Sequence, residues 1–258
     1  MKSRLEGKRI LVTRPKKQAG KLAHELEDRG AVPVLLSTTE IAEPEAYDPL
    51  DQALRNLVDF DWVIFTSANA VSAVSSRMHA IGVPVEAISS RKLGVVGPAT
   101  AETLQSLFRD PDLMPTDYVA AGIARSLGDI AGQKFLLPRG DLARPELPME
   151  LSLQGATVLE VTAYRTIRTD DACTLRPEDR PDAITLASGE GTRATVAKLR
   201  EAGLSSWLEE IPIACIGPVT AETILDEGYS PAVVAQEFTI AGLIDALERL
   251  FEEVPLNA

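Results

Sequence analysis

Short apolar runs alternate along the chain with longer segments in which apolar residues recur every three or four positions. The runs are three to five residues long and rich in Val, Ile and Leu, which is typical of buried strands. They predict strands at residues 9–13, 32–36, 62–66, 92–96, 134–137, 157–161, 183–186, 213–216 and 232–234. The longer segments predict helices at residues 16–29, 70–80, 99–108, 192–202 and 239–251. Because such alternation indicates parallel sheets covered on both faces, we expect a doubly wound α/β architecture similar to flavodoxin.

One ten-residue segment occurs twice in the chain, at residues 95–104 and again at 215–224. Six of its ten positions are identical, and the two copies start 120 residues apart. Three further pairs of similar segments follow in the same order: residues 7–14 with 132–139, 30–35 with 155–160, and 64–67 with 185–188. Self-similarity at a nearly fixed spacing indicates a structural repeat, so we infer two copies of one α/β unit.

Two stretches, residues 36–44 and 161–168, break the alternation of strands and helices. Each stays extended and β-prone after the preceding strand is expected to end, and small or polar residues alternate with apolar ones. The stretches occupy matching places in the two copies. They either pair as two antiparallel strands that link two domains or form two surface loops, and the pattern is compatible with both.

Composition narrows the class of protein. The chain has 258 residues, which corresponds to between one and two domains, and 45% of them are apolar, which is enough for a sizeable core and excludes intrinsic disorder. No stretch approaches the ~18 uninterrupted apolar residues of a membrane span. The first apolar run, at residues 10–12, is far too short for a signal peptide. We therefore expect a cytoplasmic protein with no membrane partner.

The net charge of -12 argues against nucleic acid as a partner, because neutralising phosphates requires a basic face. The two cysteines, Cys173 and Cys215, cannot form a disulfide framework and are predicted to be small buried apolar groups. The only histidines, His24 and His79, fall on predicted helix surfaces, which excludes a zinc site built from His and a Ser–His–Asp triad. No glycine-rich phosphate loop occurs, which argues against a nucleotide cofactor, and no Asp or Glu cluster has the spacing of an EF-hand.

Four polar turns follow predicted strands and open predicted helices, and they are the first candidates for a ligand site. Two of them, residues 65–70 and 186–191, occupy equivalent places in the repeat, and the other two have the pattern Gly-Pro-x-Thr-Ala. Proline suits the first helical position, where no N–H is needed. The N–H groups that follow are expected to stay free, and the helix dipole favours an anion beside them. Thr100 and Thr220 add hydroxyl donors. The alternative is simple capping of the helices, but four turns in two symmetric sets favour a shared anion site.

Arginine residues at other strand ends extend this candidate site. Arg139 and Arg144 follow one predicted strand of this acidic chain, and Arg14 follows the equivalent strand of the first copy. A guanidinium offers a planar donor fork that fits a carboxylate, although each of these arginines is also compatible with a solvated salt bridge. One set of donors in each copy predicts a polyanionic ligand held between two domains.

Six of these segments resemble the uroporphyrinogen-III synthase family, and they occur in the order found in that family. They are Thr-Arg-Pro at residues 13–15, Phe-Thr-Ser-x-Asn-Ala-Val at 65–71, Val-Gly-x-x-Thr-Ala at 96–101, Pro-Arg-Gly at 138–140, Tyr-Arg-Thr at 164–166 and Ile-Gly-Pro-x-Thr-Ala at 216–221. The resemblance spans essentially the whole chain. The second copy departs from the pattern, because residues 187–191 contain no equivalent of Asn69.

The resemblance implies a domain arrangement in which the repeat copies exchange halves. Residues 1–37 and 167–258 would form the first domain and residues 38–166 the second, each of them α/β. Linker strands at about 37–43 and 161–168 would join the domains. The resemblance therefore favours paired linker strands over surface loops, and two domains joined in this way are expected to show hinge motion.

The resemblance also implies a reaction. The substrate would be hydroxymethylbilane, a linear tetrapyrrole with eight carboxylates. The enzyme would expel the terminal hydroxyl, close the ring through a spiro intermediate with inversion of ring D, and release uroporphyrinogen III and water. The family acts in haem biosynthesis without a metal or an organic cofactor. The resemblance also suggests that the enzyme is a monomer. Its substrate would be transferred from the preceding enzyme of the pathway.

Tyr164 is the residue that the family motif assigns to the chemistry, since a protonated phenol can donate to the departing hydroxyl. The alternative for Tyr164 is a strand tyrosine packed on the linker pair. The expected substrate-binding residues are Arg14, Thr66, Ser67, Asn69, Thr100, Ala101, Arg139, Gly140, Arg144, Ser188, Gly189, Thr220 and Ala221. Because the substrate closes unaided to the isomer without inversion, much of the catalysis is expected to be orientation, with modest effects of single substitutions.

Two other functional classes fit the same sequence features. One is a two-domain receptor for a small anion, similar to periplasmic binding proteins, although the missing export signal weighs against it. The other is a two-domain glycosyltransferase-like enzyme, although no phosphate loop for a nucleotide sugar occurs.

Overall fold

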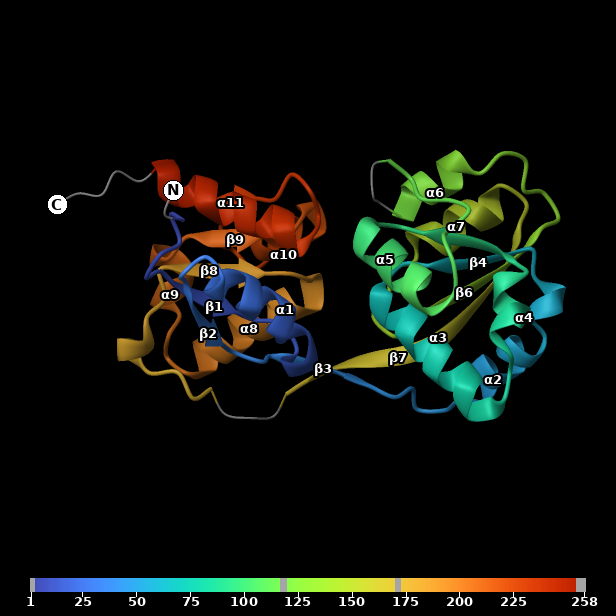
Figure 1. Cartoon of the computed structure of the whole chain (residues 1–258), viewed down its shortest axis with the longest axis horizontal. Helices are drawn as coiled ribbons and strands as arrows, with labels where there is room; N and C mark the ends of the chain where they lie inside the picture. The colour runs from blue at the N-terminus through green and yellow to red at the C-terminus, as the bar shows by residue number, and fades with distance from the viewer. Residues whose placement is uncertain (1–2, 117–119, 170–172, 254–258) are drawn as a thin grey trace. The chain divides into compact units, whose positions relative to one another are not determined.

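The computed structural model describes residues 3–116, 120–169 and 173–253 of the chain. Contacts between Cα atoms separate unit 1, made of Met1–Glu40 and Ile167–Ala258, from unit 2, made of Ile41–Thr166. From the sequence, the corresponding boundaries are expected after residues 37 and 166. In Figure 1, unit 1 is drawn in blue and in orange to red, and unit 2 in light blue through green to yellow.

Unit 1 is built on a five-stranded sheet whose strands are ordered β10-β9-β8-β1-β2. The strands are β1 (Arg9–Val12), β2 (Val32–Leu35), β8 (Ala183–Leu186), β9 (Ile213–Cys215) and β10 (Val233–Val234). All four neighbouring pairs are parallel. Renumbered along the chain, the order is that of flavodoxin, with the switch point between β1 and β8.

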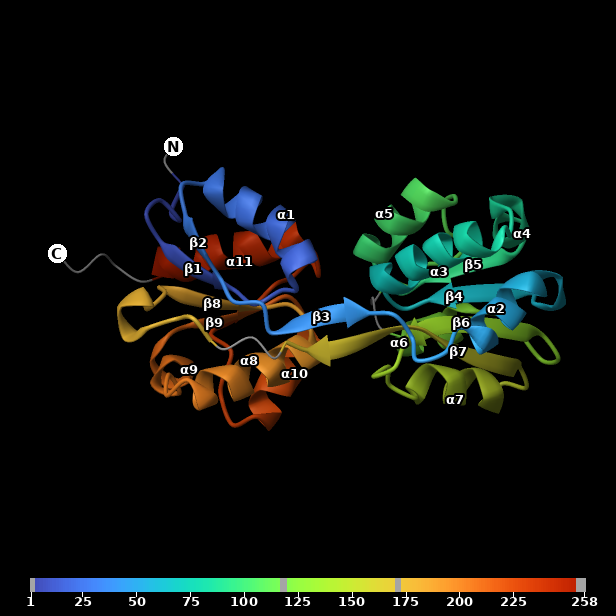
Figure 2. The ribbon, with the colours of Figure 1, turned by 90° about the horizontal axis from the view of Figure 1, so that it is seen from below.

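Helices cover both faces of the unit 1 sheet, as Figure 2 shows. One face carries α1 (Lys16–Glu27) and α11 (Ile240–Glu253), and the other carries α8 (Gly189–Glu201), α9 (Ser206–Glu210) and α10 (Pro218–Asp226). Successive residues of β1 alternate between these layers, because Ile10 and Val12 pack with α1 and α11, whereas Leu11 packs with α8, α9 and α10. Burying an aliphatic side chain of this size contributes about 1.5–3 kcal/mol, so both faces of the strand stabilise the unit.

Unit 2 repeats this plan with the strand order β3-β7-β6-β4-β5. The strands are β3 (Thr39–Ala42), β4 (Trp62–Phe65), β5 (Lys92–Val95), β6 (Lys134–Gly140) and β7 (Thr157–Arg168). The pairs β4–β5, β4–β6 and β6–β7 are parallel, whereas Figure 2 shows β3 and β7 side by side and running in opposite directions. The parallel strands have the same order as their counterparts in unit 1, and their switch point lies between β4 and β6.

Two hydrophobic clusters fill unit 2, one on each face of its sheet. The first contains residues of α2 (Asp48–Arg55), α3 (Ala68–Ile81), α4 (Val85–Ser89) and α5 (Pro98–Leu107), and the second contains residues of α6 (Ala120–Ser126) and α7 (Glu146–Leu153). Within β4, Val63 and Phe65 belong to the first cluster and Trp62 and Ile64 to the second. All four side chains are buried, which explains why this strand reads as a continuous apolar run.

The predicted fold class is confirmed: the chain is α/β, and its two sheets have similar topology and are parallel apart from strand β3. Each unit combines strands from both copies of the sequence repeat, since β1 and β2 come from the first copy and β8, β9 and β10 from the second. Both ambiguous stretches contain extended strand, β3 and the second half of β7, and these two strands are neighbours in one sheet. The surface-loop alternative is therefore wrong for them.

Helix α10 has no predicted range and is anticipated only by the Gly-Pro turn that opens it, whereas five shorter helices have no counterpart among the predicted elements: α2, α4, α6, α7 and α9. Each has eight residues or fewer, which is too short for a window of about 11–18 residues to show a helical period. Two short 3-10 helices, Leu57–Asp59 and Pro177–Asp179, were missed for the same reason. Strand β6 also continues through Pro138 to Gly140, beyond its predicted end at residue 137.

The other sequence-based expectations concern single residues. His24 and His79 are exposed on helices, and Cys215 is buried, as predicted, whereas Cys173 is only partly buried.

Within the described ranges, none of the helices combines the length and the apolar character that crossing a bilayer requires. The same ranges contain no group of three or more His, Cys, Asp and Glu side chains placed to hold a metal ion.

Candidate active site

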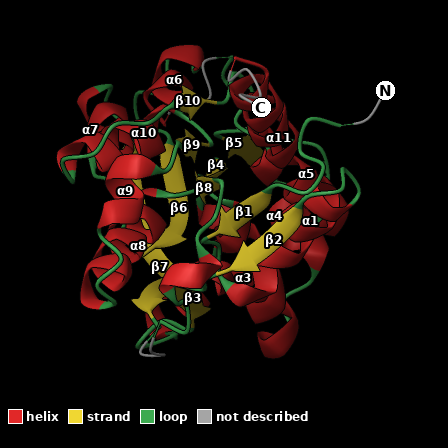
Figure 3. Cartoon of the chain, turned by 90° about the vertical axis from the view of Figure 1, so that its left-hand side faces the viewer, coloured by secondary structure: helices red, strands yellow, loops and turns green. Residues whose placement is uncertain are grey.

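The predicted site residues gather at the carboxyl ends of the strands in both units. In unit 2, Thr66 and Ser67 directly follow β4, and Gly140 ends the neighbouring strand β6. In unit 1, Arg14 follows β1, and Ser188 follows the neighbouring strand β8. Each of these strand pairs flanks a switch point, where open α/β sheets bind their ligands. Figure 3 draws the strands of both sheets in yellow.

Serine hydroxyls cap the two helices that leave the switch points. The Ser67 Oγ accepts a hydrogen bond from the N–H of Ala70 at 3.2 Å, and the Ser188 Oγ accepts one from the N–H of Gly191 at 3.1 Å. The repeat is thus preserved at the level of single hydrogen bonds. Helix capping, the alternative considered for these turns, is present at both, and Asn69 lies half-buried in the first turn of α3.

The two Gly-Pro turns start α5 and α10 without a side-chain cap. Thr100 and Thr220 are 6% and 3% exposed, so their side chains are buried. The N–H groups of Thr100 and Ala101 both donate to the carbonyl of Gly97 at 3.0 Å, and that of Ala221 donates to the carbonyl of Gly217 at 3.1 Å. The expectation that the N–H groups after each proline stay free is therefore wrong for these three, because the first turn of the helix already uses them.

Tyr164 joins the site in unit 2 from strand β7. Its phenol oxygen lies 3.1 Å from the Ser67 Oγ, and either oxygen can be the donor. The ring is partly buried and packs against the hydrophobic cluster under α3 and α5. The hydroxyl of a side chain anchored in the core thus reaches the N-terminus of α3.

Arg139 lies under the surface of unit 2, with 6% of its area exposed. Its Nη1 donates to Glu160 at 2.5 Å, and its Nη2 donates to the carbonyl of Arg144. The guanidinium therefore ties the turn after β6 to strand β7. A cavity of about 140 Å³ beside it is lined by Arg139, Gly140, Asp141, Ala143, Glu160, Val161 and Thr162. The carboxylate of Glu160 already pairs with Arg139, which disfavours a second carboxylate there.

The other two predicted arginines differ in their surroundings. Arg14 is half-buried after β1, and burial lowers the pKa of its guanidinium. The side chain of Arg144 is exposed on the turn whose backbone Arg139 holds. A ligand therefore has easier access to the guanidinium of Arg144 than to that of Arg139.

In unit 1, the start of α8 packs closely against α10. A Cβ added at Gly189 would lie 3.1 Å from the Oγ1 of Thr223, and the hydroxyl of Thr223 donates to the carbonyl of Val219 at 2.8 Å. Ser188, Gly189, Thr220 and Ala221 are therefore brought together at one edge of the unit 1 sheet. Tyr164 itself lies in unit 2.

Asp141 is a residue of the site that sequence reasoning missed. Its N–H donates to the carbonyl of Tyr164 at 3.2 Å, and its Oδ1 accepts a hydrogen bond from the N–H of Thr166 at 3.0 Å. The position directly after Pro-Arg-Gly was the available signal, since a carboxylate at a strand end often binds a neighbouring backbone N–H.

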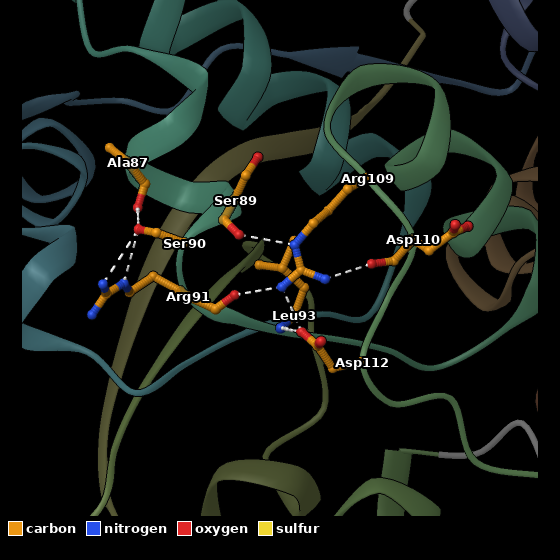
Figure 4. Close-up of polar contacts among 8 residues, drawn as sticks. All are labelled: Ala87, Ser89, Ser90, Arg91, Leu93, Arg109, Asp110 and Asp112. Carbon is orange, nitrogen blue, oxygen red and sulfur yellow. Dashed lines mark hydrogen bonds and ion pairs between the residues drawn. The ribbon is translucent and has the colours of Figure 1, made fainter.

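A second arginine-rich cluster lies at the amino end of β5, since Arg91 directly precedes that strand. Figure 4 shows its side chains and their polar contacts. Arg109 donates to the carbonyls of Ser89 and Arg91 at 2.9 and 2.6 Å, and to Asp112 at 2.6 Å. Burial alone would raise the pKa of Asp112, but hydrogen bonds from Arg109 and from the N–H of Leu93 hold it below its usual value. This cluster fixes a turn and lies away from the ligand edge, so we assign it a structural role.

The chain is similar to known proteins over most of its length. A family model described as Uroporphyrinogen-III synthase HemD matches residues 20–245. The uroporphyrinogen-III synthase of Synechococcus elongatus is 33% identical over 255 residues, which cover 95% of this chain and 96% of that protein. A putative uroporphyrinogen-III synthase of Methanocaldococcus jannaschii is 27% identical, and the match covers 95% of this chain and 99% of the relative.

Solved structures agree on the fold. A mutant uroporphyrinogen III synthase of Thermus thermophilus superposes with a TM-score of 0.66, over 96% of this chain and 100% of that one. The two sequences are 18% identical, so this similarity supports the fold alone.

Proposed function

The chain belongs to the uroporphyrinogen-III synthase family, and on this basis we propose that it closes hydroxymethylbilane into uroporphyrinogen III, a step of haem biosynthesis. Within the structure, one observation carries the proposal: the phenol of Tyr164 is held against Ser67 at the carboxyl edge of a parallel sheet. A proton donor at this edge is suited to a reaction in which a hydroxyl group must leave.

The proposed reaction is a dehydration coupled to ring closure. The bond between the terminal carbon and its hydroxyl breaks, and one proton joins the departing oxygen to give water. The terminal carbon then bonds to the substituted α-carbon of ring D, which gives a spiro intermediate. The old bond between that α-carbon and its bridging carbon breaks, the bridging carbon bonds to the free α-carbon of ring D, and this carbon loses one proton, so the macrocycle closes with ring D inverted. Because one proton is taken up and one is released, with no change in oxidation state, the reaction balances without an oxidant, a reductant or a cofactor.

Tyr164 is proposed as the donor of that first proton. Ser67 supports this role, because its hydroxyl is itself fixed by the N–H of Ala70 and cannot turn away without losing a helix cap. General acid catalysis of this kind contributes about 10²–10⁴ in rate. The rest of the catalysis is assigned to orientation of a substrate that already closes unaided.

The carboxylates of the substrate are proposed to bind where helices begin. Unit 2 presents the N-termini of α3 and α5 at the carboxyl edge of its sheet, and unit 1 presents those of α8 and α10. A helix N-terminus favours a negative charge by about 0.3–1 kcal/mol at an exposed position. The proposed binding residues are Arg14, Thr66, Ser67, Asn69, Thr100, Ala101, Arg139, Gly140, Arg144, Ser188, Gly189, Thr220 and Ala221. Two of them contribute indirectly: Arg139 holds the turn that carries Arg144, and Gly140 lies against the ring of Tyr164.

Family membership also supports the finer features of the proposal. The enzyme would be a cyclising hydro-lyase that acts as a cytoplasmic monomer without a metal or an organic cofactor. The preceding enzyme of the pathway would supply its unstable substrate. Sedimentation at several protein concentrations tests the monomer.

Product analysis tests the proposed function. Freshly made hydroxymethylbilane is incubated with the protein, and the type I and type III isomers are separated after oxidation. We expect type III to be the main product. A protein that only binds the substrate would leave the type I isomer, the product of unaided closure, and that result would refute the proposal.

A further inference from the structure

The pairing of β6 with β7 changes register next to Tyr164. The two strands pair regularly from Lys134 opposite Thr157 up to Arg139 opposite Thr162. The next residue, Gly140, lies opposite Tyr164, so Ala163 is an extra residue in β7. Extra residues of this kind are frequent beside active sites, where they redirect a side chain.

The register shift turns Tyr164 towards the core. Side chains alternate between the faces of a regular strand, so Tyr164 would share the face of the exposed Thr162. Instead, its ring packs against the same hydrophobic cluster that contains Val161 and Ala163. The shift thus gives the phenol a fixed ring position, from which its hydroxyl reaches Ser67.

Gly140 lies against the ring of Tyr164 at the point of the shift. A Cβ added at Gly140 would come within 2.8 Å of the ring atom Cζ and within 2.9 Å of the phenol oxygen. Real Cβ atoms do not approach other atoms this closely, so any side chain at this position would displace the phenol. The backbone of Gly140 therefore bounds one side of the space that the phenol ring occupies.

Asp141 holds the backbone at Tyr164 and directly after it. Its N–H donates to the carbonyl of Tyr164 itself, and its carboxylate accepts the N–H of Thr166, two residues further along β7. Gly140 and Asp141 thus fix both the ring and the main chain of the same tyrosine.

From this geometry we propose that Gly140 and Asp141 are positioning residues for the Tyr164 phenol. Gly140 leaves the space that the ring needs, and Asp141 keeps the irregular end of β7 in place. Neither residue takes part in proton transfer, and both act through Tyr164. This inference rests on the proposed function, because it assigns a purpose to the position of the proton donor.

The first test compares Gly140→Ala with Gly128→Ala. Gly128 lies in the same unit, and a Cβ added there meets no atom within 4 Å, so this variant is the matched control. We expect Gly140→Ala to lower kcat by about tenfold and to raise the share of type I product, because displacing a reacting group by about 1 Å costs up to about 10²-fold in rate. The KM should change little, and Gly128→Ala should behave as wild type.

The second test asks whether Gly140 acts through the phenol. In the Tyr164→Phe background, Gly140→Ala should cause little further loss of kcat, since the hydroxyl that it displaces is already absent. An equal loss in both backgrounds would show that Gly140 acts independently of the phenol and would overturn the proposal. So would wild-type kcat and a wild-type isomer ratio for Gly140→Ala.

Asp141 gives an independent test that does not add bulk beside the ring. Asp141→Asn keeps an oxygen that can accept the N–H of Thr166 and is expected to retain near wild-type kcat, whereas Asp141→Ala loses the acceptor and should lower kcat severalfold. Equal kcat for the two variants would contradict the role of Asp141. If the wild-type protein itself yields no type III product, the proposed function fails, whereas an active wild type with unaffected variants refutes only the positioning role.

Discussion

The phenol oxygen of Tyr164 lies 3.1 Å from the hydroxyl oxygen of Ser67, although 97 residues separate them in the sequence. Ser67 belongs to the turn between β4 and α3, and Tyr164 lies on β7, two strands away in the same sheet. The contact links the proposed proton donor to the N-terminus of a helix.

Removal of the phenol hydroxyl tests the assignment of Tyr164. We expect Tyr164→Phe to lower kcat by about 10²-fold, the low end of the contribution of a general acid, because orientation by the rest of the site persists. The share of type I product should rise as unaided closure competes. Steady-state kinetics with isomer analysis measures both effects, and wild-type values for rate and isomer ratio would remove Tyr164 from the mechanism.

Ser67 has two roles that can be separated experimentally. Ser67→Ala should lower the free energy of unfolding by about 1 kcal/mol, the usual cost of losing an N-cap, and should also lower kcat because the phenol loses its partner. Ser188→Ala removes the equivalent cap in unit 1 and should lower stability by a similar amount.

Ser67→Thr supplies the conservative comparison, because threonine keeps the hydroxyl. Its kcat should lie well above that of Ser67→Ala in the same assay. Denaturant unfolding of all three variants gives the stability changes. Equal kcat for Ser67→Ala and Ser67→Thr would show that the hydroxyl contact has no catalytic effect.

The ion pair between Asp51 and Arg77 predicts a pH dependence of stability. Two hydrogen bonds, at 2.6 and 2.7 Å, join the side chains and hold the pKa of Asp51 below its usual value of about 3.9. Because the folded-state pKa is depressed, the stabilisation is fully present above pH 4 and is lost as the pH falls through that lower value.

Asp51→Asn should therefore be less stable than wild type at pH 7, and the difference should shrink below about pH 4. Thermal unfolding of both proteins between pH 3 and pH 7, with Asp48→Asn as a control on the same helix, measures this trend. A difference that stays constant over the whole range would show that the charge of Asp51 does not contribute.

The thiol of Cys215 should be inert in the folded protein. Burial at the end of β9 raises its pKa to about 12, so almost none of it is thiolate at pH 8. A thiol-labelling reagent should modify Cys215 only after unfolding, whereas the partly buried Cys173 serves as the internal comparison. Mass spectrometry of the labelled peptides reports each cysteine, and fast labelling of Cys215 without denaturant would contradict its buried position.

Much of the fold could be predicted because the strands and the repeated turns are visible as local patterns in the sequence. Fully buried strands such as β4 read as continuous apolar runs, and the repeated Gly-Pro-x-Thr-Ala segments marked equivalent turns in the two copies. Short helices such as α4 and α9, with five residues each, lack enough positions to show a period.

The candidate site could be predicted only in part. Ser67 and Tyr164 each followed from a motif, but their contact depends on how the three strands β4, β6 and β7 are ordered in space. Arg139 was expected to face a ligand, and its partners could not be foreseen: Glu160 lies 21 residues away, and the other acceptor is a backbone carbonyl. The register shift beside Tyr164 is likewise a property of pairing, which alternation along one strand does not reveal.

The most direct test asks whether this protein determines the orientation of ring D in the product. It measures the isomer composition of the product at a fixed amount of hydroxymethylbilane and increasing enzyme concentration. We predict that the type III fraction rises with enzyme until type I product disappears, and that the Tyr164→Phe variant needs far more protein to reach the same fraction. A product that stays entirely type I at every protein concentration would contradict the proposed role of the chain.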